Sequence, residues 1–277
     1  MTNAGKSIFP PLILAVAPNG VRKTKRDHEN LPVTAAEIAN AAATCRDAGA
    51  AMIHLHVRNR DGGHCLDVSA YRDAIDAIRR TAGSQMIIQP TSESGGIYEP
   101  AQQMAMVREL RPETVSLALR EIMPDATHEP DGAVFFGWLR KARITPQYIL
   151  YTPDEVTRYH DLVRRGIIPG DRHYLLYVIG RYDSEPDPEK LEDFLRSDDS
   201  PRPWMVCAFG AAEAAIVSAA AAAGGHARVG FENNLRLSDG TTAPDNAALV
   251  QQARASCQMI GRPVASTDEA RATLLAD

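Results

Sequence analysis

The stretch Ala51-Met52-Ile53-His54-Leu55-His56-Val57 decides how this chain is interpreted. It is a short, almost wholly apolar run, and such a run predicts a buried β-strand. Alternate residues of a strand point to the same side, so His54 and His56 project together while Leu55 points away. Because Zn²⁺ binds neutral histidine nitrogens, two imidazoles on one face supply half of a zinc site.

A possible third ligand lies far downstream, where the apolar run 227–231 leads into Glu232. If both runs are strands of one barrel, their carboxyl ends meet at the same end of that barrel. His54, His56 and Glu232 would then form a metal site of two histidines and one glutamate, with a position left open for catalysis.

Both ligand assignments have ordinary alternatives. A lone buried histidine is usually a hydrogen-bonded core residue, although two at i and i+2 entering a polar turn are less easily explained that way. His64 lies just past this turn and is a competing ligand. Glu232 could instead be the ion-pair partner of Arg228 or Arg236.

The rest of the chain predicts a single barrel. Apolar, β-branched runs alternate with segments of helical period, and no linker-like stretch divides residues 1–277. Eight strands and eight helices in strict alternation favour a closed (β/α)8 barrel, and no GxGxxG follows the first strand to support a dinucleotide fold. The predicted strands are 12–17, 51–57, 86–89, 114–117, 148–151, 174–179, 204–207 and 227–231, and the predicted helices are 35–48, 68–82, 101–110, 133–142, 154–165, 188–196, 211–223 and 244–260.

Composition narrows the class of protein. The chain is 44% hydrophobic, and its net charge of −5 is spread without blocks, so neither nucleic acid nor a membrane is an expected partner. Its four cysteines lie far apart without a CxxC pair, which is typical of reduced thiols in a cytoplasmic protein. The basic run Arg22-Lys23-Thr24-Lys25-Arg26 is either a solvated loop or a clamp for an anionic substrate or a nucleotide phosphate.

In such a barrel the active site lies at the carboxyl ends of the strands. The third strand is followed by Thr91-Ser92-Glu93-Ser94-Gly95-Gly96, which is either a plain turn or a set of hydroxyls and backbone N–H groups that grip a carboxylate or phosphate. Arg228 would stabilise negative charge beside the metal. Zinc with an open position polarises a carbonyl or activates water, so spacing does not choose between carbon–carbon chemistry and hydrolysis.

At these residues the chain resembles the β-keto acid cleavage enzymes, a family known through 3-keto-5-aminohexanoate cleavage enzyme. The resemblance covers nearly the full length, and its most specific parts are His54-Leu55-His56-Val57-Arg58 and Arg228-Val229-Gly230-Phe231-Glu232-Asn233. It implies a (β/α)8 barrel, a homo-oligomer (tetramer or dimer), and a divalent metal, typically Zn²⁺, bound by His54, His56 and Glu232. The implied reaction combines a β-keto acid with acetyl-CoA and yields acetoacetate and a new acyl-CoA by a retro-Claisen route.

The resemblance also implies roles for further residues. Arg228 would steady oxyanionic intermediates, and many members carry Asp, as part of a proton-transferring pair, where this chain has Asn233. An amide cannot accept that proton. One possibility is that Glu93 or Glu121 serves as the base instead. The other is that the chemistry differs, and the protein is a zinc hydrolase or a binding protein that has lost its base. The residues implied to hold the substrate are Thr91, Ser92, Gly95, Gly96 and Ser116.

Overall fold

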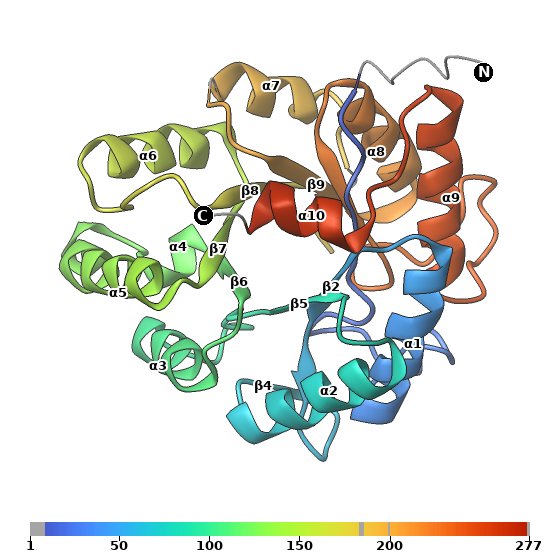
Figure 1. Ribbon diagram of the computed structural model, residues 1–277, viewed down its shortest axis with the longest axis horizontal. Helices are drawn as coiled ribbons and strands as arrows, with labels where there is room; N and C mark the ends of the chain where they lie inside the picture. Colours follow the sequence, from blue (N-terminus) through green and yellow to red (C-terminus); the bar gives the residue numbers. More distant parts are fainter. Residues whose placement is uncertain (1–8, 183–185, 199, 276–277) are drawn as a thin grey trace.

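Eight parallel strands form the centre of the molecule, in a computed structural model that describes residues 9–182, 186–198 and 200–275. They are β1 (Leu14–Val16), β2 (Met52–Leu55), β5 (Ile87–Pro90), β6 (Thr114–Ala118), β7 (Thr145–Leu150), β8 (Tyr174–Ile179), β9 (Trp204–Ala208) and β10 (His226–Val229). Their hydrogen-bonded order is β5-β2-β1-β10-β9-β8-β7-β6. The first and last of these meet where the Ser92 N–H donates to the Ser116 carbonyl over 3.1 Å. The sheet thus closes into a barrel (Figure 1), which confirms the predicted (β/α)8 fold.

Each predicted strand is present, but the run 51–57 is not one continuous strand. β2 ends at Leu55, and the chain then enters an antiparallel hairpin made of β3 (Val57–Arg58) and β4 (His64–Cys65). The side chain of Asn59 stabilises the hairpin turn by accepting hydrogen bonds from backbone N–H groups within it. The expectation that both histidines lie on one strand was therefore wrong, since His56 falls between β2 and β3.

Helices surround the barrel, and the eight predicted ones are all present with ends shifted by a few residues. They are α1 (Ala35–Ala48), α2 (Val68–Thr81), α3 (Pro100–Leu110), α5 (Glu129–Ala142), α6 (Pro153–Arg164), α7 (Lys190–Ser197), α8 (Glu213–Ala222) and α9 (Asn246–Met259). The start of α1 follows its predicted capping box, because the Thr34 hydroxyl accepts from the Glu37 N–H and the Glu37 carboxylate accepts from the Thr34 N–H.

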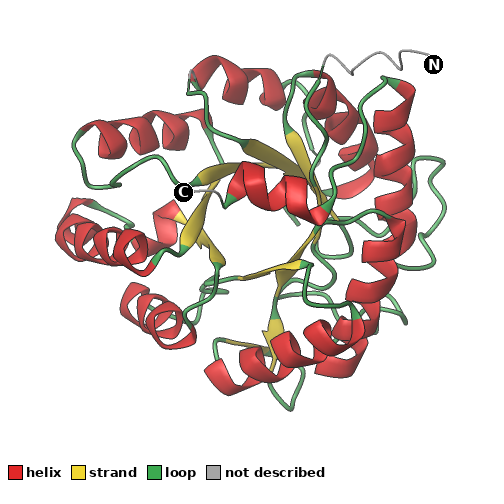
Figure 2. Cartoon of the chain, in the orientation of Figure 1, coloured by secondary structure: helices red, strands yellow, loops and turns green. Residues whose placement is uncertain are grey.

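Two α-helices of the described residues were not predicted. α4 (Leu119–Ile122) is a single turn directly after β6, and α10 (Thr267–Leu274) follows the last predicted helix. α10 lies across one end of the barrel (Figure 2), where Ala270 and Leu274 join the same buried cluster as Ile13 and Met52. Since these side chains come from the amino-terminal parts of the strands, α10 covers that end and leaves the carboxyl end for function.

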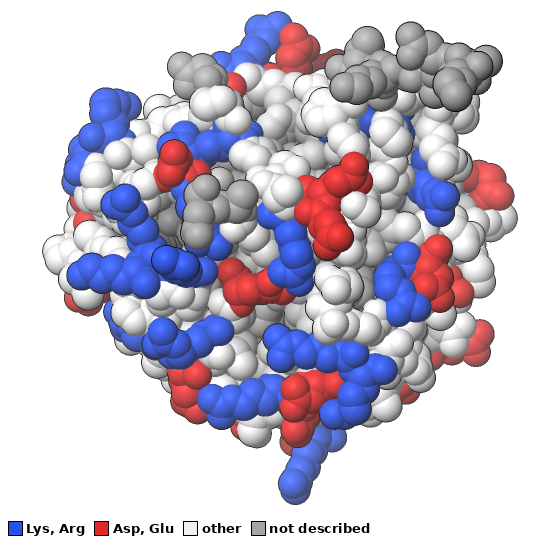
Figure 3. Space-filling view, viewed as in Figure 1, with Lys and Arg blue, Asp and Glu red and all other residues white. Residues whose placement is uncertain are grey.

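The face that carries α10 shows acidic and basic side chains interspersed (Figure 3). Arg271 of α10 forms an ion pair with Glu113, just before β6, and so ties the helix to the barrel. In the part of the chain that the structure describes, no helix is both long and apolar enough to span a membrane.

Candidate metal centre and active site

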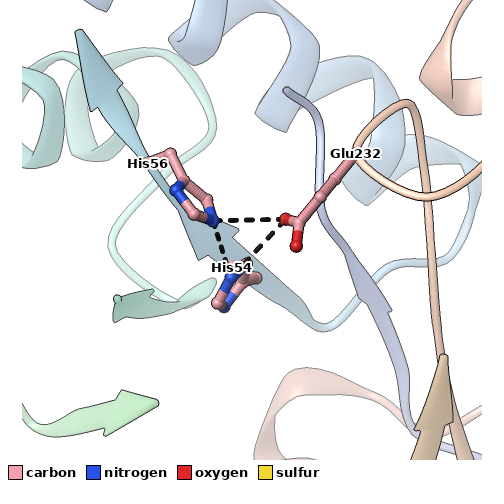
Figure 4. Close-up of side chains that lie close together, drawn as sticks. All are labelled: His54, His56 and Glu232. Atoms are coloured by element: carbon pink, nitrogen blue, oxygen red, sulfur yellow. Dashed lines mark hydrogen bonds and ion pairs between the residues drawn. The ribbon is translucent and has the colours of Figure 1, made fainter. Parts of the chain in front are cut away.

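Three buried side chains converge at the carboxyl end of the barrel (Figure 4). His54 belongs to β2, His56 follows it, and Glu232 lies in the loop after β10. The Nε2 atoms of the two histidines are 3.0 Å apart, and Glu232 Oε2 lies 3.5 Å from His54 Nε2 and 3.3 Å from His56 Nε2. His56 reaches this position although it has left the strand, because its backbone still continues the direction of β2.

The chemistry of these atoms fits a divalent metal ion. Two imidazole nitrogens and a carboxylate oxygen are the donor set of many catalytic zinc sites. Among the described residues, Glu232 Oε2 has no hydrogen-bond donor although it is buried, and a buried carboxylate oxygen without a partner is costly. A cation held between the three side chains would satisfy all three atoms at once.

A chain of hydrogen bonds across the barrel interior fixes which nitrogen of His54 can bind a metal. The Thr145 carbonyl can only accept, and it accepts from the Thr114 hydroxyl over 2.7 Å. Thr114 Oγ1 must then accept from the Tyr174 hydroxyl, 3.0 Å away. The Tyr174 oxygen in turn accepts from Gln89 Nε2 over 2.7 Å, so Gln89 presents Oε1 to His54 Nδ1, at 2.9 Å.

His54 therefore donates through Nδ1 and keeps the lone pair of Nε2 for a metal. Burial, reinforced by the positive charge of Arg228, lowers the pKa of His54 well below its usual value, which keeps the ring neutral. This is the arrangement by which an outer hydrogen-bond partner commonly orients a metal-binding histidine.

Glu232 is held in place from several sides. An Arg228 guanidinium nitrogen donates to Oε1 over 3.2 Å, which leaves Oε2 directed at the histidines. Burial opposes ionisation, but the positive charge of Arg228 holds the pKa of Glu232 well below its usual range. Its backbone carbonyl accepts from Lys23 Nζ over 2.6 Å and from the Tyr182 hydroxyl over 3.2 Å. The ion pair with Arg228, expected as an alternative to metal binding, is present, but it uses only Oε1 and leaves Oε2 for a metal.

Two glycines make room for this side chain. Gly230 has φ +136°, and a Cβ there would lie 2.4 Å from the Ala17 carbonyl oxygen. Gly20 has φ +63°, and a Cβ there would lie 2.5 Å from Glu232 Cγ. Both positions therefore require glycine for the loop after β10 to bring Glu232 against the barrel mouth.

Of these three side chains, Glu232 lines a cavity of about 280 Å³ at the carboxyl ends of the strands, and the two histidines beside it are buried. Its walls carry charged residues of both signs together with aromatic side chains. Its lining residues include Arg22, Glu93, Gly95, Gly96, Arg120, Glu121, Tyr151, Phe209, Arg228 and Glu232.

Two carboxylates in this cavity are candidate bases, and they differ in their surroundings. Glu93 Oε2 lies 3.7 Å from His56 Nε2, and burial raises the pKa of Glu93 to about 7 against the opposing effect of His56. Glu121 Oε2 accepts from the Ser94 N–H over 2.9 Å and from Gln103 Nε2 over 3.0 Å. Those hydrogen bonds occupy Glu121 Oε2, whereas Glu93 Oε2 lies beside the metal-binding atoms, so Glu93 is the better placed of the two to take up a proton.

The structure separates the residues that we expected to hold a substrate. Gly95 and Gly96 line the cavity, whereas Thr91, Ser92 and Ser116 are fully buried behind it. Thr91 Oγ1 accepts from the Glu93 N–H, and Ser92 Oγ donates to the Ser116 carbonyl, so both hydroxyls brace the loop. Among described residues, Ser116 Oγ has no hydrogen-bond partner, and it is the hydroxyl left available.

Asn233 does not line the cavity, although it directly follows Glu232. It lies on an adjacent groove instead. His64, the competing ligand, is also accounted for, because its Nε2 atom lies 2.7 Å from the Glu93 carbonyl and outside the group of three.

The polar residues inside the barrel were missed by sequence reasoning. Gln147 is an amide within the mostly apolar β7 and Tyr174 is the first residue of β8, and such polar groups in buried strands were the signal that could have found them. Both side chains accept from Gln89 Nε2, at 3.0 and 2.7 Å. They belong to the site because they determine how Gln89 meets His54.

Comparison with known proteins gives a consistent result. The sequence profile of the β-keto acid cleavage enzyme family matches residues 11–275. The 3-oxoadipate:acetyl-CoA acetyltransferase of Cupriavidus necator is 31% identical over 272 residues, which cover 95% of this chain and 94% of that protein. The 3-keto-5-aminohexanoate cleavage enzyme of Acetoanaerobium sticklandii is 29% identical over 270 residues, covering 95% and 97%.

Solved structures share the fold at lower identity. ObcA, in its apo structure, matches with a TM-score of 0.71 and 15% identity; the match covers 88% of this chain but 65% of ObcA. The type I 3-dehydroquinate dehydratase of Clostridium difficile matches with a TM-score of 0.59 and 10% identity, covering 90% and 92%. These likenesses confirm the barrel, and the profile and sequence relatives show more: the chain belongs to the β-keto acid cleavage enzyme family.

Proposed function

We propose that this protein is a zinc-dependent enzyme that converts a β-keto acid and acetyl-CoA into acetoacetate and a new acyl-CoA. The observation that carries the proposal is the buried group of His54, His56 and Glu232, of which Glu232 lines a cavity that Arg228 also lines. Two relatives named for acetyl-CoA reactions support it, the acetyltransferase from Cupriavidus necator and the 3-dehydrocarnitine:acetyl-CoA trimethylamine transferase from Rhizobium meliloti.

His54, His56 and Glu232 would hold the zinc ion. When bound, zinc supplies Lewis-acid polarisation of the ketone carbonyl of the substrate. Arg228 lines the same cavity and would stabilise the negative charge that develops on a carbonyl oxygen. Gly95 and Gly96 line the cavity, and the backbone N–H of Gly95, with the Ser116 hydroxyl behind it, would hold the substrate carboxylate; the Gly96 N–H donates to Ser94 Oγ instead.

Glu93 would remove a proton from C2 of the keto acid, the carbon between the ketone and the carboxylate. The resulting carbanion attacks the carbonyl carbon of acetyl-CoA, forming a carbon–carbon bond and releasing the CoA thiolate. That thiolate then attacks the original ketone carbon, and the bond between this carbon and C2 breaks. C2 keeps the electron pair and takes a proton back from Glu93, giving acetoacetate, while the remaining acyl group leaves on CoA.

The proposal is tested by supplying zinc-loaded protein with acetyl-CoA and a panel of β-keto acids with charged, polar and apolar side groups. The expected result is acetoacetate formed in equal amount to a new acyl-CoA, with one class of keto acid preferred. His54→Ala is the control and should form none. Stoichiometric zinc with no acetoacetate from any keto acid would contradict the proposal, and keto acid breakdown without acetyl-CoA would favour a hydrolase.

A further inference from the structure

A second hollow, of about 600 Å³, lies beside the catalytic cavity. Tyr182 and Phe209 line both hollows, and their rings meet edge to face with centroids 4.8 Å apart. Arg181 also lines both, so the two spaces share one wall. We call the second hollow the basic groove, lined among others by Lys23, Arg181, Tyr182, Phe209, Asn233 and Arg236.

The charge of the basic groove has one sign. Lys23, Arg181 and Arg236 are cationic, and none of the described residues that line the groove is acidic. This contrasts with the catalytic cavity, where arginines and glutamates are mixed. The groove also lies between the loops after β9 and β10, the seventh and eighth strands of the barrel, where ligand phosphates commonly bind in this fold. Its charge and position therefore both favour an anionic ligand.

Lys23 is held at the wall that the two hollows share. Its Nζ atom donates to the Glu232 carbonyl over 2.6 Å and lies 4.7 Å from the centroid of the Tyr182 ring. An ammonium group has three N–H donors, so this contact leaves others for a ligand. The basic groove is thus built directly on the backbone of a metal-binding residue.

Asn233 is the second, independent feature of the groove. It is 3% exposed, and neither atom of its side-chain amide has a hydrogen-bond partner among the described residues. Burying an amide without partners is unfavourable, and a ligand that offers both an N–H and a carbonyl would satisfy both atoms. Because Asn233 follows Glu232, such an amide group would lie just outside the catalytic cavity.

We propose that the basic groove binds the CoA part of acetyl-CoA, with Asn233 pairing with an amide of the pantetheine arm and Arg181 and Arg236 binding its phosphates. In this arrangement the thioester would reach the metal centre, an amide would pair with Asn233 just outside the catalytic cavity, and the phosphates would lie at the exposed side chains of Arg181 and Arg236. The inference rests on the proposed function, and it gives Asn233 a role in binding where the family resemblance suggested proton transfer.

Two substrates, acetyl-CoA and acetylpantetheine, test the parts of this proposal separately. Acetylpantetheine keeps the thioester and the amides but lacks the phosphates and the nucleotide. Arg181→Glu and Arg236→Glu should each raise KM for acetyl-CoA about tenfold or more, because a charge-assisted contact is lost and repulsion is added. Arg236→Glu should leave KM for acetylpantetheine and for the keto acid unchanged; Arg181→Glu is not held to this, because Arg181 also lines the catalytic cavity. Asn233→Leu should raise KM for both thioesters.

Arg60→Glu is the matched control. Arg60 is exposed in the β3–β4 hairpin at the same end of the barrel, but it lines a different hollow. This variant should leave all three KM values unchanged. Because Asn233 is buried, circular dichroism must first show that Asn233→Leu folds; the two exposed arginines test the phosphate part without that requirement.

Calorimetric titration with CoA keeps this proposal separate from the proposed function. Wild-type protein should bind CoA, and Arg236→Glu should weaken that binding about tenfold, whether or not any keto acid is turned over. If wild-type protein forms acetoacetate while both arginine variants keep their KM for acetyl-CoA, the groove assignment is wrong and the function stands. If the groove variants lose CoA binding but no keto acid reacts, the groove stands and the function is wrong. Absence of CoA binding to wild-type protein overturns the groove assignment.

Discussion

His54 Nδ1 lies 2.9 Å from Gln89 Oε1, and this contact leaves the other nitrogen of His54 free to bind a metal. Gln89 cannot present its amide nitrogen there instead, because that nitrogen donates to Tyr174. The Tyr174 hydroxyl donates to Thr114 Oγ1, because the Thr114 hydroxyl donates to the Thr145 carbonyl on the far side of the barrel interior. A main-chain carbonyl of β7 thus determines the tautomer of a metal ligand on β2.

Gln89→Leu should weaken metal binding on the order of 10- to 100-fold, the usual effect of removing a hydrogen-bond partner of a metal ligand. The measurement is competition for zinc against a chelator of known affinity. Gln89→Glu keeps an acceptor for His54 Nδ1 and should retain more of the affinity than Gln89→Leu. Tyr174→Phe should have a smaller effect, visible in ¹⁵N NMR as a mixture of His54 tautomers in the metal-free protein. Equal zinc affinity in wild type and Gln89→Leu would contradict this role.

Arg228→Ala should still bind the metal, but its kcat should fall. Arg228 lines the catalytic cavity, and removing one group that stabilises an oxyanion costs on the order of 100- to 1000-fold in kcat. Glu232 would remain charged beside the metal ion, so zinc content measured by atomic absorption should stay near one per chain. His54→Ala is the comparison variant and should lose the zinc itself. A near-wild-type kcat for Arg228→Ala would show that Arg228 does not stabilise the oxyanion.

Glu93→Gln should abolish exchange of the C2 hydrogens of the keto acid with deuterium from solvent, a reaction that needs the base, the metal and the bound keto acid but no acetyl-CoA. Glu121→Gln is the matched control, because Glu121 lines the same cavity but already accepts two hydrogen bonds. We expect that variant to keep most of the exchange rate. Loss of exchange in Glu121→Gln with retention in Glu93→Gln would reverse the assignment.

Most of the barrel was predictable from the sequence, because strands buried on both faces read as apolar runs and helices carry caps such as Thr34 with Glu37. The metal ligands were predictable for a related reason, since two histidines that close an apolar run must lie at the barrel mouth. The break after Leu55 was not predictable, because the hairpin of β3 and β4 depends on a cross-strand pairing that spacing does not specify.

The substrate-facing residues were harder to place than the ligands. Thr91 and Ser92 follow the end of β5, as expected, whereas Ser116 lies in the middle of β6. Closure between β5 and β6 turns the hydroxyls of Thr91 and Ser92 toward the backbone. Only the barrel closure decides which side chains face the cavity. The same holds for Asn233, whose place on the groove follows from the turn at Gly230.

Glu213, at the start of α8, should make the stability of the fold depend on pH. Burial raises the pKa of Glu213 to about 8, against the hydrogen bond that Asn234 Nδ2 donates to it over 3.0 Å. A carboxyl group whose folded pKa lies above its unfolded value of 4.5 favours folding most below pH 4.5. That contribution is lost as pH rises through about 8, so this group alone should lower the free energy of unfolding between pH 5 and 9, by on the order of 4 kcal/mol.

Glu213→Gln isolates this effect, because glutamine cannot ionise and still offers an oxygen to Asn234. The free energy of unfolding in urea should therefore fall less between pH 5 and 9 in Glu213→Gln than in the wild type. Both proteins should be measured after treatment with a chelator, since metal binding brings a pH dependence of its own. Glu269→Gln serves as the comparison, because Glu269 is an exposed capping residue of α10 whose pKa is lowered by its hydrogen bonds to Ser266. Identical pH profiles for wild type and Glu213→Gln would mean that Glu213 is ionised in the folded protein at neutral pH.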